Sequence, residues 1–147
     1  MNRGKPSRRR SAKRYLFSYG TLQPRHAPAE IASTVRRLRR VGRGSVRGRL
    51  YDLGEYPGAV LSRNAPLVIG QVFELPNDPA VLTRLDEYEG FDPARPQSSL
   101  FVRKRCLVQL DSGKKLFCWM YAYNRRPGAA SPLPSGLYSK GRNHRRG

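Results

Sequence analysis

The sequence predicts an α+β fold in which a small mixed β-barrel carries flanking helices. The chain has 147 residues, enough for one domain with its own apolar core. Short apolar or alternating segments recur between turns rich in glycine and proline, which is typical of strands. Only two segments have helical spacing, and they do not alternate regularly with the strands. We therefore expect a sheet that curls into a small barrel rather than a doubly wound parallel sheet.

Six segments are predicted to be strands. They cover residues 15–19, 41–53, 59–61, 68–75, 100–110 and 115–123. The second of these alternates arginine with apolar or small residues, which predicts one solvated face. The last two are expected to form a hairpin, because Asp111-Ser112-Gly113 between them has the composition of a tight turn. A final ordered stretch is expected at residues 133–139.

The first helix is expected over residues 28–41, where Ile31, Val35 and Leu38 recur at helical spacing. Four arginines fall in its second half, and cations are favoured near the C-terminal end of a helix dipole. Such an arginine-rich face is either a phosphate-binding surface or, more commonly, a solvated one.

The second helix is expected over residues 77–90. Asn77 or Asp78 can cap its free N–H groups, Pro79 fits its first turn, and Gly90 is a typical stop. On a helical projection its apolar side chains cover one arc roughly 120° wide. They are Val81, Leu82, Leu85 and Tyr88.

Glu89 falls inside this apolar arc, about 20° from Leu82. Asp86 lies just off the edge of the arc and Glu87 projects to the opposite side, so Glu89 alone of the three acids is expected to face the core. Periodicity leaves two interpretations open. Either the helix frays at Tyr88 and Glu89 turns to water, or Glu89 is a desolvated carboxylate with a raised pKa, usable as a general acid and base near neutral pH.

The chain carries 29 Lys and Arg against 10 Asp and Glu, a formal net charge of +19. The excess is greatest at the two ends, which contain no acid. We predict a disordered basic arm at residues 1–14 and a disordered basic tail at 139–147 around a folded domain at 15–138. These segments can contact polyanions nonspecifically. A dedicated nucleic-acid binder is an alternative, but basic and aromatic residues do not interleave along the sequence as in an RNA-binding sheet motif.

Apolar runs, cysteines and histidines indicate where the protein is located and whether it binds a metal ion. No apolar run reaches the length of a membrane span, and YLFSYG after the basic arm is too short for a secretory signal, so we expect a cytoplasmic protein without membrane contact. Cys106 and Cys118 lack CxxC spacing, and the only histidines are His26 and His144, so no metal site is expected. The cysteines are interpreted as small core residues without a disulfide.

The predicted first strand ends abruptly at Gly20-Thr21-Leu22, and Pro24 prevents regular pairing beyond it. This break is either an ordinary strand-to-loop turn or a turn in which Gly20 lets successive N–H groups face a bound carbonyl or carboxylate. The four residues alone do not decide between these interpretations.

Four motifs occur in a fixed order along the chain: YGTL at 19–22, GRLYDLGEYPG at 48–58, LDEYEG at 85–90 and WMYAYN at 119–124. Together, at these separations, they closely resemble the gamma-glutamylcyclotransferase-like family, which includes gamma-glutamylamine cyclotransferases. The resemblance extends over roughly residues 15–138. Members of this family share a small β-barrel with flanking helices.

The resemblance implies that Glu89 is the catalytic acid and base and that no cofactor is needed. It also implies a substrate-binding set of residues. They are Tyr19, Gly20, Thr21, Leu22 and Tyr123, with the YGTL loop at the substrate's glutamyl end. Phe101 stands where many relatives have a tyrosine, and residues 23–26 lack a glycine often found after YGTL; both differences bear on substrate preference.

The implied reaction is the cyclisation of a small γ-glutamyl amide. The substrate's own α-amine attacks its γ-carbonyl, which gives 5-oxoproline and releases the attached amine. A base must take a proton from the ammonium, the same group must return one to the leaving nitrogen, and N–H donors must face the developing oxyanion. Glu89 is assigned the first two roles, and the backbone at residues 20–22 the third. A catalytically silent binding module is the main alternative, and the sequence leaves the leaving group and the oligomeric state open.

Overall fold

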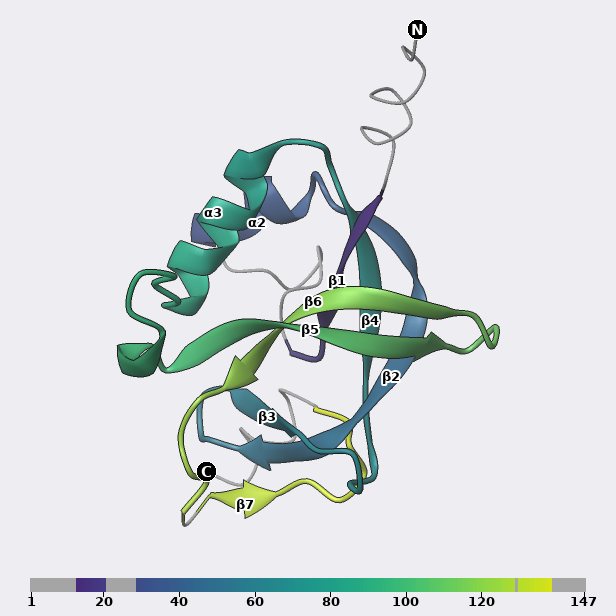
Figure 1. Ribbon diagram of the computed structural model, residues 1–147, viewed down its shortest axis with the longest axis vertical. Helices are drawn as coiled ribbons and strands as arrows, with labels where there is room; N and C mark the ends of the chain where they lie inside the picture. Colours follow the sequence, from purple (N-terminus) through teal and green to yellow (C-terminus); the bar gives the residue numbers. More distant parts are fainter. Residues whose placement is uncertain (1–12, 21–28, 129, 139–147) are drawn as a thin grey trace, which may run out of the picture.

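The computed structural model describes residues 13–20, 29–128 and 130–138. Within them, five strands close into a small mixed β-barrel that carries two helices, so the predicted fold class is confirmed (Figure 1). The barrel strands are β1 (Arg14–Ser18), β2 (Arg39–Asp52), β4 (Leu67–Leu75), β5 (Phe101–Leu110) and β6 (Lys115–Tyr123). The predicted basic arm and tail fall outside the described residues except for Lys13 and Arg14, and they stay predictions.

The barrel strands follow the order β2-β4-β1-β6-β5, and β5 pairs with β2 to close the circle. Every neighbouring pair is antiparallel except β1 and β6, which are parallel. Their ladder consists of one residue pair, Leu16 with Trp119, whereas the β5–β6 hairpin is paired along its whole length. The β1–β6 ladder is therefore the shortest of the barrel.

Two apolar cores lie on the two faces of the barrel wall, because side chains alternate along each strand. Phe17 points into the barrel, whereas its neighbour Leu16 points outward beneath the helices. The interior core consists of Phe17, Val46, Leu50, Ala59, Val68, Val72, Cys106, Val108, Leu110, Cys118, Met120 and Ala122. The core between barrel and helices consists of Leu16, Ile31, Val35, Leu38, Phe73, Leu75, Val81, Leu82, Leu85, Phe101 and Tyr121.

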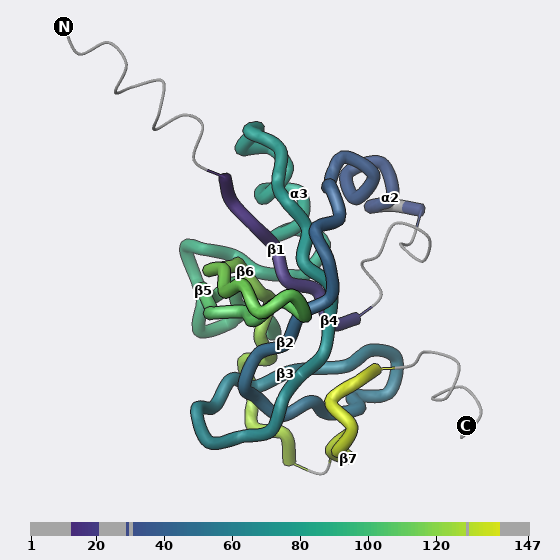
Figure 2. The backbone as a smooth tube through the Cα atoms, turned by 90° about the vertical axis from the view of Figure 1, so that its right-hand side faces the viewer, coloured from purple at the N-terminus to yellow at the C-terminus, as the bar shows by residue number. Residues whose placement is uncertain are grey.

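The helices and the short strands lie at opposite ends of the molecule. Figures 1 and 2 show α2 (Ala29–Val35) and α3 (Pro79–Glu89) at the upper end, and β3 (Pro57–Leu61) and β7 (Ser131–Pro132) at the lower end. Both short strands pair with the second half of β2. A 3₁₀ turn, η1 (Pro96–Ser98), lies in the connection from α3 to β5.

Helix α3 begins and ends where its local signals predict. Asp78 is the N-cap, and its carboxylate accepts a hydrogen bond from the N–H of Ala80 at 3.0 Å. Pro79 occupies the first turn, where no intrahelical donor is required. Gly90 takes the left-handed conformation at φ 74°, which is costly for other residues and stops the helix directly after Glu89.

Helix α2 is shorter than predicted. The expected helix over 28–41 is wrong in its second half, because α2 ends at Val35 and strand β2 starts at Arg39. There, Arg39 pairs with Glu74 and Arg40 with Phe73 across the β2–β4 ladder. Pairing to a strand more than thirty residues away satisfies these backbone groups, and the Nε of Arg39 also donates to Glu74 at 3.1 Å. Tertiary contacts override the helical spacing of this segment.

Candidate active site

A pocket of about 370 Å³ opens where the end of β1, the start of β3, the end of α3 and the start of β5 meet. Its wall is largely apolar and aromatic. It is lined by Leu16, Phe17, Ser18, Tyr19, Gly20, Tyr56, Pro57, Tyr88, Glu89, Gly90, Leu100, Phe101 and Tyr121. Among these described residues Glu89 is the only carboxylic acid, and none is Lys, Arg or His. The pocket thus offers one ionisable acid in an apolar setting.

Glu89 is the last residue of α3, and its side chain is half-buried in the pocket wall. Burial raises its pKa to about 7, because the apolar surroundings disfavour the charged form. No hydrogen bond or ion pair from another described residue to this carboxylate opposes the shift. A carboxyl group that titrates near neutral pH can both accept and return a proton.

Tyr19 lies on the same pocket and holds three strands together. Its hydroxyl donates to the carbonyl of Tyr121 on β6 at 2.7 Å and accepts from the N–H of Ala59 on β3 at 3.1 Å. Burial raises its pKa, and the nearby negative charge of Glu89 adds to the effect. The Tyr19 hydroxyl therefore stays neutral, and its bonds to β3 and β6 fix the wall that it contributes.

The Asp86 side chain is more buried than predicted. Placed by periodicity at the edge of the apolar arc, it is buried, with 6% of its surface exposed. The guanidinium of Arg103 donates to both of its oxygens, at 2.8 and 3.1 Å, and the hydroxyl of Tyr121 donates to it at 2.6 Å. The expectation that Glu89 alone of the three acids faces inward is thus wrong, whereas Glu87 is exposed as predicted. A buried carboxylate is tolerated here because it has charged and neutral donors.

The bridge between Asp86 and Arg103 clamps the end of α3 onto β5. The guanidinium of Arg103 also stacks on two aromatic rings, with its carbon 4.5 Å from the centroid of Trp119 and 5.8 Å from that of Phe91. Since Asp86 lies one helical turn before Glu89, this clamp sets the position from which Glu89 enters the pocket.

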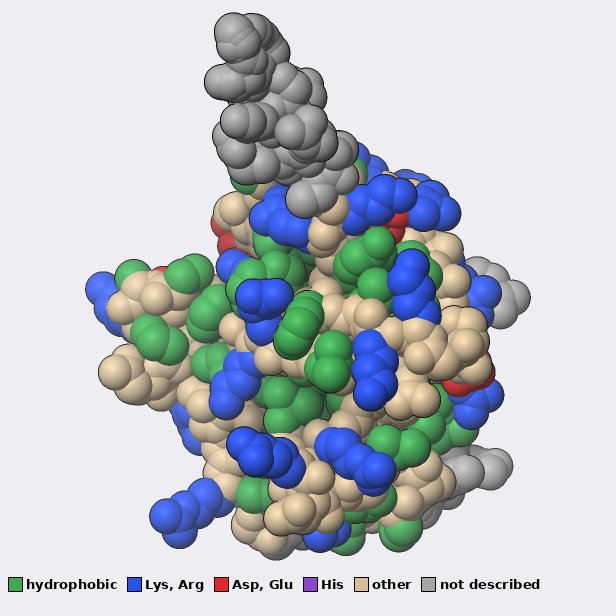
Figure 3. Space-filling model, turned by 45° about the vertical axis from the view of Figure 1, so that its right-hand side comes forward, with side chains coloured by type: hydrophobic (Ala, Val, Ile, Leu, Met, Phe, Trp, Pro, Cys, Tyr) green, Lys and Arg blue, Asp and Glu red, His purple; other side chains and the backbone are tan. Residues whose placement is uncertain are grey.

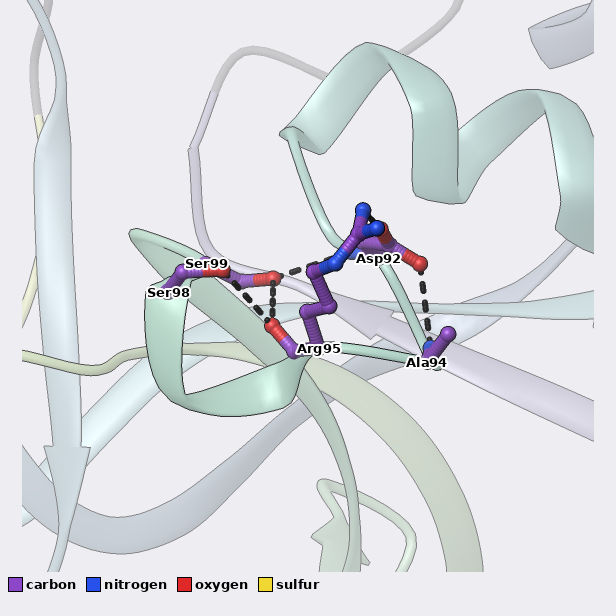
Figure 4. A network of polar contacts seen from close by, with 5 residues as sticks. All are labelled: Asp92, Ala94, Arg95, Ser98 and Ser99. Atoms are coloured by element: carbon purple, nitrogen blue, oxygen red, sulfur yellow. Dashed lines mark hydrogen bonds and ion pairs between the residues drawn. The ribbon is translucent and has the colours of Figure 1, made fainter.

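The segment from α3 to β5 is held by its own hydrogen bonds, as Figure 4 shows. The Asp92 N–H donates to the hydroxyl of Ser99 at 2.9 Å, and that hydroxyl donates to the carbonyl of Arg95 at 3.2 Å. The Asp92 carboxylate accepts from the N–H of Ala94 at 3.0 Å. Leu100, which lines the pocket, follows Ser99 directly, so these bonds fix the approach to the pocket's outer wall.

The predicted site residues are only partly brought together. Tyr19, Gly20 and Glu89 line one pocket, whereas Thr21 and Leu22 lie outside the described residues. Tyr123 does not line the pocket, and its ring packs against Phe101 with centroids 5.6 Å apart.

Several residues that line the pocket lie outside the predicted catalytic and substrate-binding set, and of these only Phe101 was connected with substrate preference. They are Tyr56, Pro57, Tyr88, Leu100, Phe101 and Tyr121. Tyr56, Pro57, Tyr88 and Tyr121 lie within the family motifs, but spacing along the chain does not show which side chains from separate elements face one pocket.

The described part of the chain contains no metal-binding cluster and no membrane-spanning helix. No group of three or more His, Cys, Asp or Glu within it is arranged to hold a metal ion. Cys106 and Cys118 are buried with free thiols, and burial raises the pKa of each to about 12. None of the helices described is both long and apolar enough to cross a membrane.

Comparison with solved structures places this fold among known ones. YkqA from Bacillus subtilis matches with a TM-score of 0.65 at 19% identity, over 92% of this chain but 43% of that protein, so this chain spans less than half of it. An AIG2-like protein from Mus musculus has a TM-score of 0.65 at 20% identity, over 86% of this chain and 88% of the other. YtfP from Escherichia coli has a TM-score of 0.60 at 28% identity, over 87% of this chain and 98% of YtfP.

Sequence comparison identifies the family. A search of curated protein sequences gives no significant match. The family model described as "Gamma-glutamyl cyclotransferase, AIG2-like" matches residues 16–140, which include the barrel apart from the first two residues of β1, both helices and every described residue that lines the pocket. The resemblance seen in the four motifs is therefore confirmed, and the chain belongs to the gamma-glutamyl cyclotransferase, AIG2-like family.

Proposed function

We propose that this protein converts a γ-glutamyl amide to 5-oxoproline and releases the attached amine, with Glu89 as general base and then general acid. The observation that carries the proposal is the half-buried Glu89 carboxyl, with a pKa raised to about 7 by burial, in a pocket without a described cation. Family membership supports the same reaction class.

The reaction needs no protein nucleophile. The α-amine of the substrate attacks its own γ-carbonyl carbon, forming the ring C–N bond, and the bond from that carbon to the leaving nitrogen breaks. Starting from the α-ammonium, the attacking nitrogen loses two protons in all, one before and one after it attacks. The leaving nitrogen gains two and departs as an ammonium. Glu89 carries each proton from one nitrogen to the other, so protons balance within one turnover. Backbone N–H groups at the Gly20 turn are the proposed donors to the oxyanion.

The raised pKa of Glu89 lowers the free-energy cost of taking a proton from the substrate's ammonium group. An α-ammonium group titrates near pH 8, so transfer of its proton to a carboxylate with a pKa of about 7 costs about 1 kcal/mol. Transfer to an ordinary glutamate would cost about 5 kcal/mol. Burial of Glu89 therefore lowers the proton-transfer cost by about 3 to 4 kcal/mol, equivalent to a few hundredfold in rate if it is fully expressed in the transition state.

The pocket mouth supports an amine with an apolar stem as the leaving group. Tyr56 and Leu100 are 41% and 37% exposed at the mouth, and the Phe101 ring packs edge-on against Tyr56 with centroids 5.8 Å apart. A carboxylate on the leaving group would find no cation among the described lining residues. We therefore expect γ-glutamyl alkylamides to be better substrates than γ-glutamyl amino acids.

The test is incubation of the full chain with a panel of γ-glutamyl compounds, followed by measurement of 5-oxoproline. Glu89→Gln should lower kcat by about a hundredfold or more with little change in KM, because the amide keeps hydrogen-bonding capacity but cannot accept the proton. Glu87→Gln is the matched control, since it removes an exposed carboxylate from the same helix turn.

The proposal fails if no compound in the panel releases 5-oxoproline, or if Glu89→Gln retains full turnover. Equal losses in both variants would assign the effect to general electrostatics rather than to a positioned base. Saturable binding of γ-glutamyl compounds without turnover would instead favour a silent binding module of the same fold.

A further inference from the structure

A second groove, of about 400 Å³, lies on the barrel surface where β1 and β6 diverge. The two strands pair only at Leu16 and Trp119, so the residues before this pair line an open groove. Its lining consists of Lys13, Arg14, Tyr15, Arg105, Phe117, Cys118 and Trp119. None of these residues lines the pocket that holds Glu89, so the groove is a separate feature.

Strand register places cations beside aromatic rings on this surface. Arg105 pairs with Trp119 and Leu107 with Phe117, so these four side chains share the outward face of the β5–β6 hairpin. The Arg105 guanidinium carbon lies 4.9 Å from the centroid of the Phe117 ring. Phe117 is nevertheless 59% exposed, which makes it the most exposed large apolar side chain among the described residues. An aromatic ring is thus presented to solvent within a cationic surface.

The charge of the surroundings is strongly positive. The described groove lining contains three cations and no acid, although Lys13 lies 3.9 Å from the carboxylate of Glu74 nearby. Seen from the side toward which the hairpin extends, the molecule carries Lys and Arg side chains interspersed with hydrophobic ones (Figure 3). In the sequence, residues 1–12 add five further bases immediately before Lys13.

We propose that this groove binds single-stranded nucleic acid, with a base stacked on the exposed Phe117 ring and with phosphates contacted by the cations of its lining. Proteins that bind single strands without sequence preference combine a positive groove with aromatic stacking side chains, and both parts are present here. A neutral apolar partner would leave the cations without counter-charges. A duplex would not offer free base faces to Phe117.

The experiment measures fluorescence anisotropy of labelled oligo(U) RNA and oligo(dT) DNA, each about twelve nucleotides long, with the full chain over a range of salt concentrations. Phe117→Ala should weaken binding to single strands about tenfold and leave the salt slope unchanged, because it removes a stacking ring and no charge. Arg105→Gln should reduce the salt slope by about 0.7. Phe117→Trp should retain the affinity.

Matched controls separate the groove from the rest of the basic surface. Leu67→Ala removes an equally apolar exposed side chain, and Arg63→Gln an exposed cation, both outside the groove, and neither should reproduce these effects. Heparin, a polyanion without bases, should bind Phe117→Ala as it binds the parent chain. Binding to both oligonucleotides, or to only one of them, supports the site and identifies which nucleic acid it takes.

Three results would overturn the proposal. Phe117→Ala and Phe117→Trp could both bind oligonucleotides as the parent chain does, which would exclude stacking. Phe117→Ala could lose heparin and oligonucleotide affinity equally, which would leave charge alone as the cause. It could also convert a self-associated protein to a monomer without changing oligonucleotide affinity, which would make the aromatic face a contact between copies of this chain.

Discussion

The Glu89 carboxyl is expected to destabilise the fold at alkaline pH, so Glu89→Gln should stabilise the protein there. In the folded state burial raises the pKa of Glu89 from 4.5 to about 7. Below the unfolded value, the carboxyl is protonated in both states and its burial carries no charge penalty. As the pH rises through the folded value, the buried group must ionise, and this part of the stability is lost.

The size of the effect follows from the shift in pKa. Raising the pKa from 4.5 to about 7 corresponds to roughly 3 kcal/mol, which is fully expressed only above pH 7. Because the side chain is half-buried and the pocket opens to water, solvent screening reduces this value, and we expect between about 1 and 3 kcal/mol. For a chain of this length that corresponds to an increase in Tm of about 3 to 9 °C.

The assay is urea unfolding of the parent chain, Glu89→Gln and Glu87→Gln at about pH 4.5 and about pH 8. Glu89→Gln should have the higher midpoint at the alkaline pH, and its advantage should nearly vanish at the acidic pH. Glu87→Gln should match the parent chain at both, since Glu87 is exposed. A Glu89→Gln advantage that is independent of pH, or that is greater in acid, would refute a desolvated carboxyl at this position.

Two further predictions concern the clamp on α3 and the basic ends. Arg103→Met should destabilise the fold by about 3 to 5 kcal/mol in urea unfolding, because it leaves the buried Asp86 carboxylate without its cation. Adding Asp86→Asn to this variant should recover part of the lost stability. An unchanged urea midpoint for Arg103→Met would contradict a stabilising ion pair between Asp86 and Arg103. Removal of residues 1–12 and 139–147 should leave the unfolding midpoint and 5-oxoproline release nearly intact while sharply weakening salt-sensitive nucleic-acid binding. If the shortened chain keeps some affinity for oligonucleotides and Phe117→Ala removes it, that remaining affinity belongs to the groove.

Signals that act within a few residues predicted α3 and the hairpin well. The Asp78 cap, Pro79 in the first turn and the Gly90 stop lie next to the positions that they control, and each has the expected geometry. The turn at residues 111–113 likewise joins β5 and β6 as predicted. Helical periodicity left open whether Glu89 turns to water or inward, and in the structure it is the last residue of α3 and lines the pocket.

Features that depend on distant residues could not be predicted in this way. Helical spacing continues through Leu38, yet the chain leaves the helix after Val35 because Arg39 pairs with a strand that lies some thirty residues later. Asp86 is drawn into the interior by Arg103 and Tyr121, which are 17 and 35 residues away. Basic and aromatic residues do not interleave along the chain, and only the register of β5 with β6 brings Arg105 beside Phe117 and Trp119.

The contrast between Asp86 and Glu89 explains why one acid of α3 suits proton transfer and the other does not. They lie one turn apart on the same helix, and each is at least partly buried. Asp86 forms an ion pair with Arg103, and both of its oxygens already accept hydrogen bonds from Arg103 or Tyr121, so its carboxylate is held within the protein rather than offered to a substrate. Glu89 has no described cation beside it, so burial acts unopposed and brings its pKa to the range of a general base. A cation moved to Glu89 would stabilise the helix end but lower this pKa, and the proposed proton acceptor would be lost.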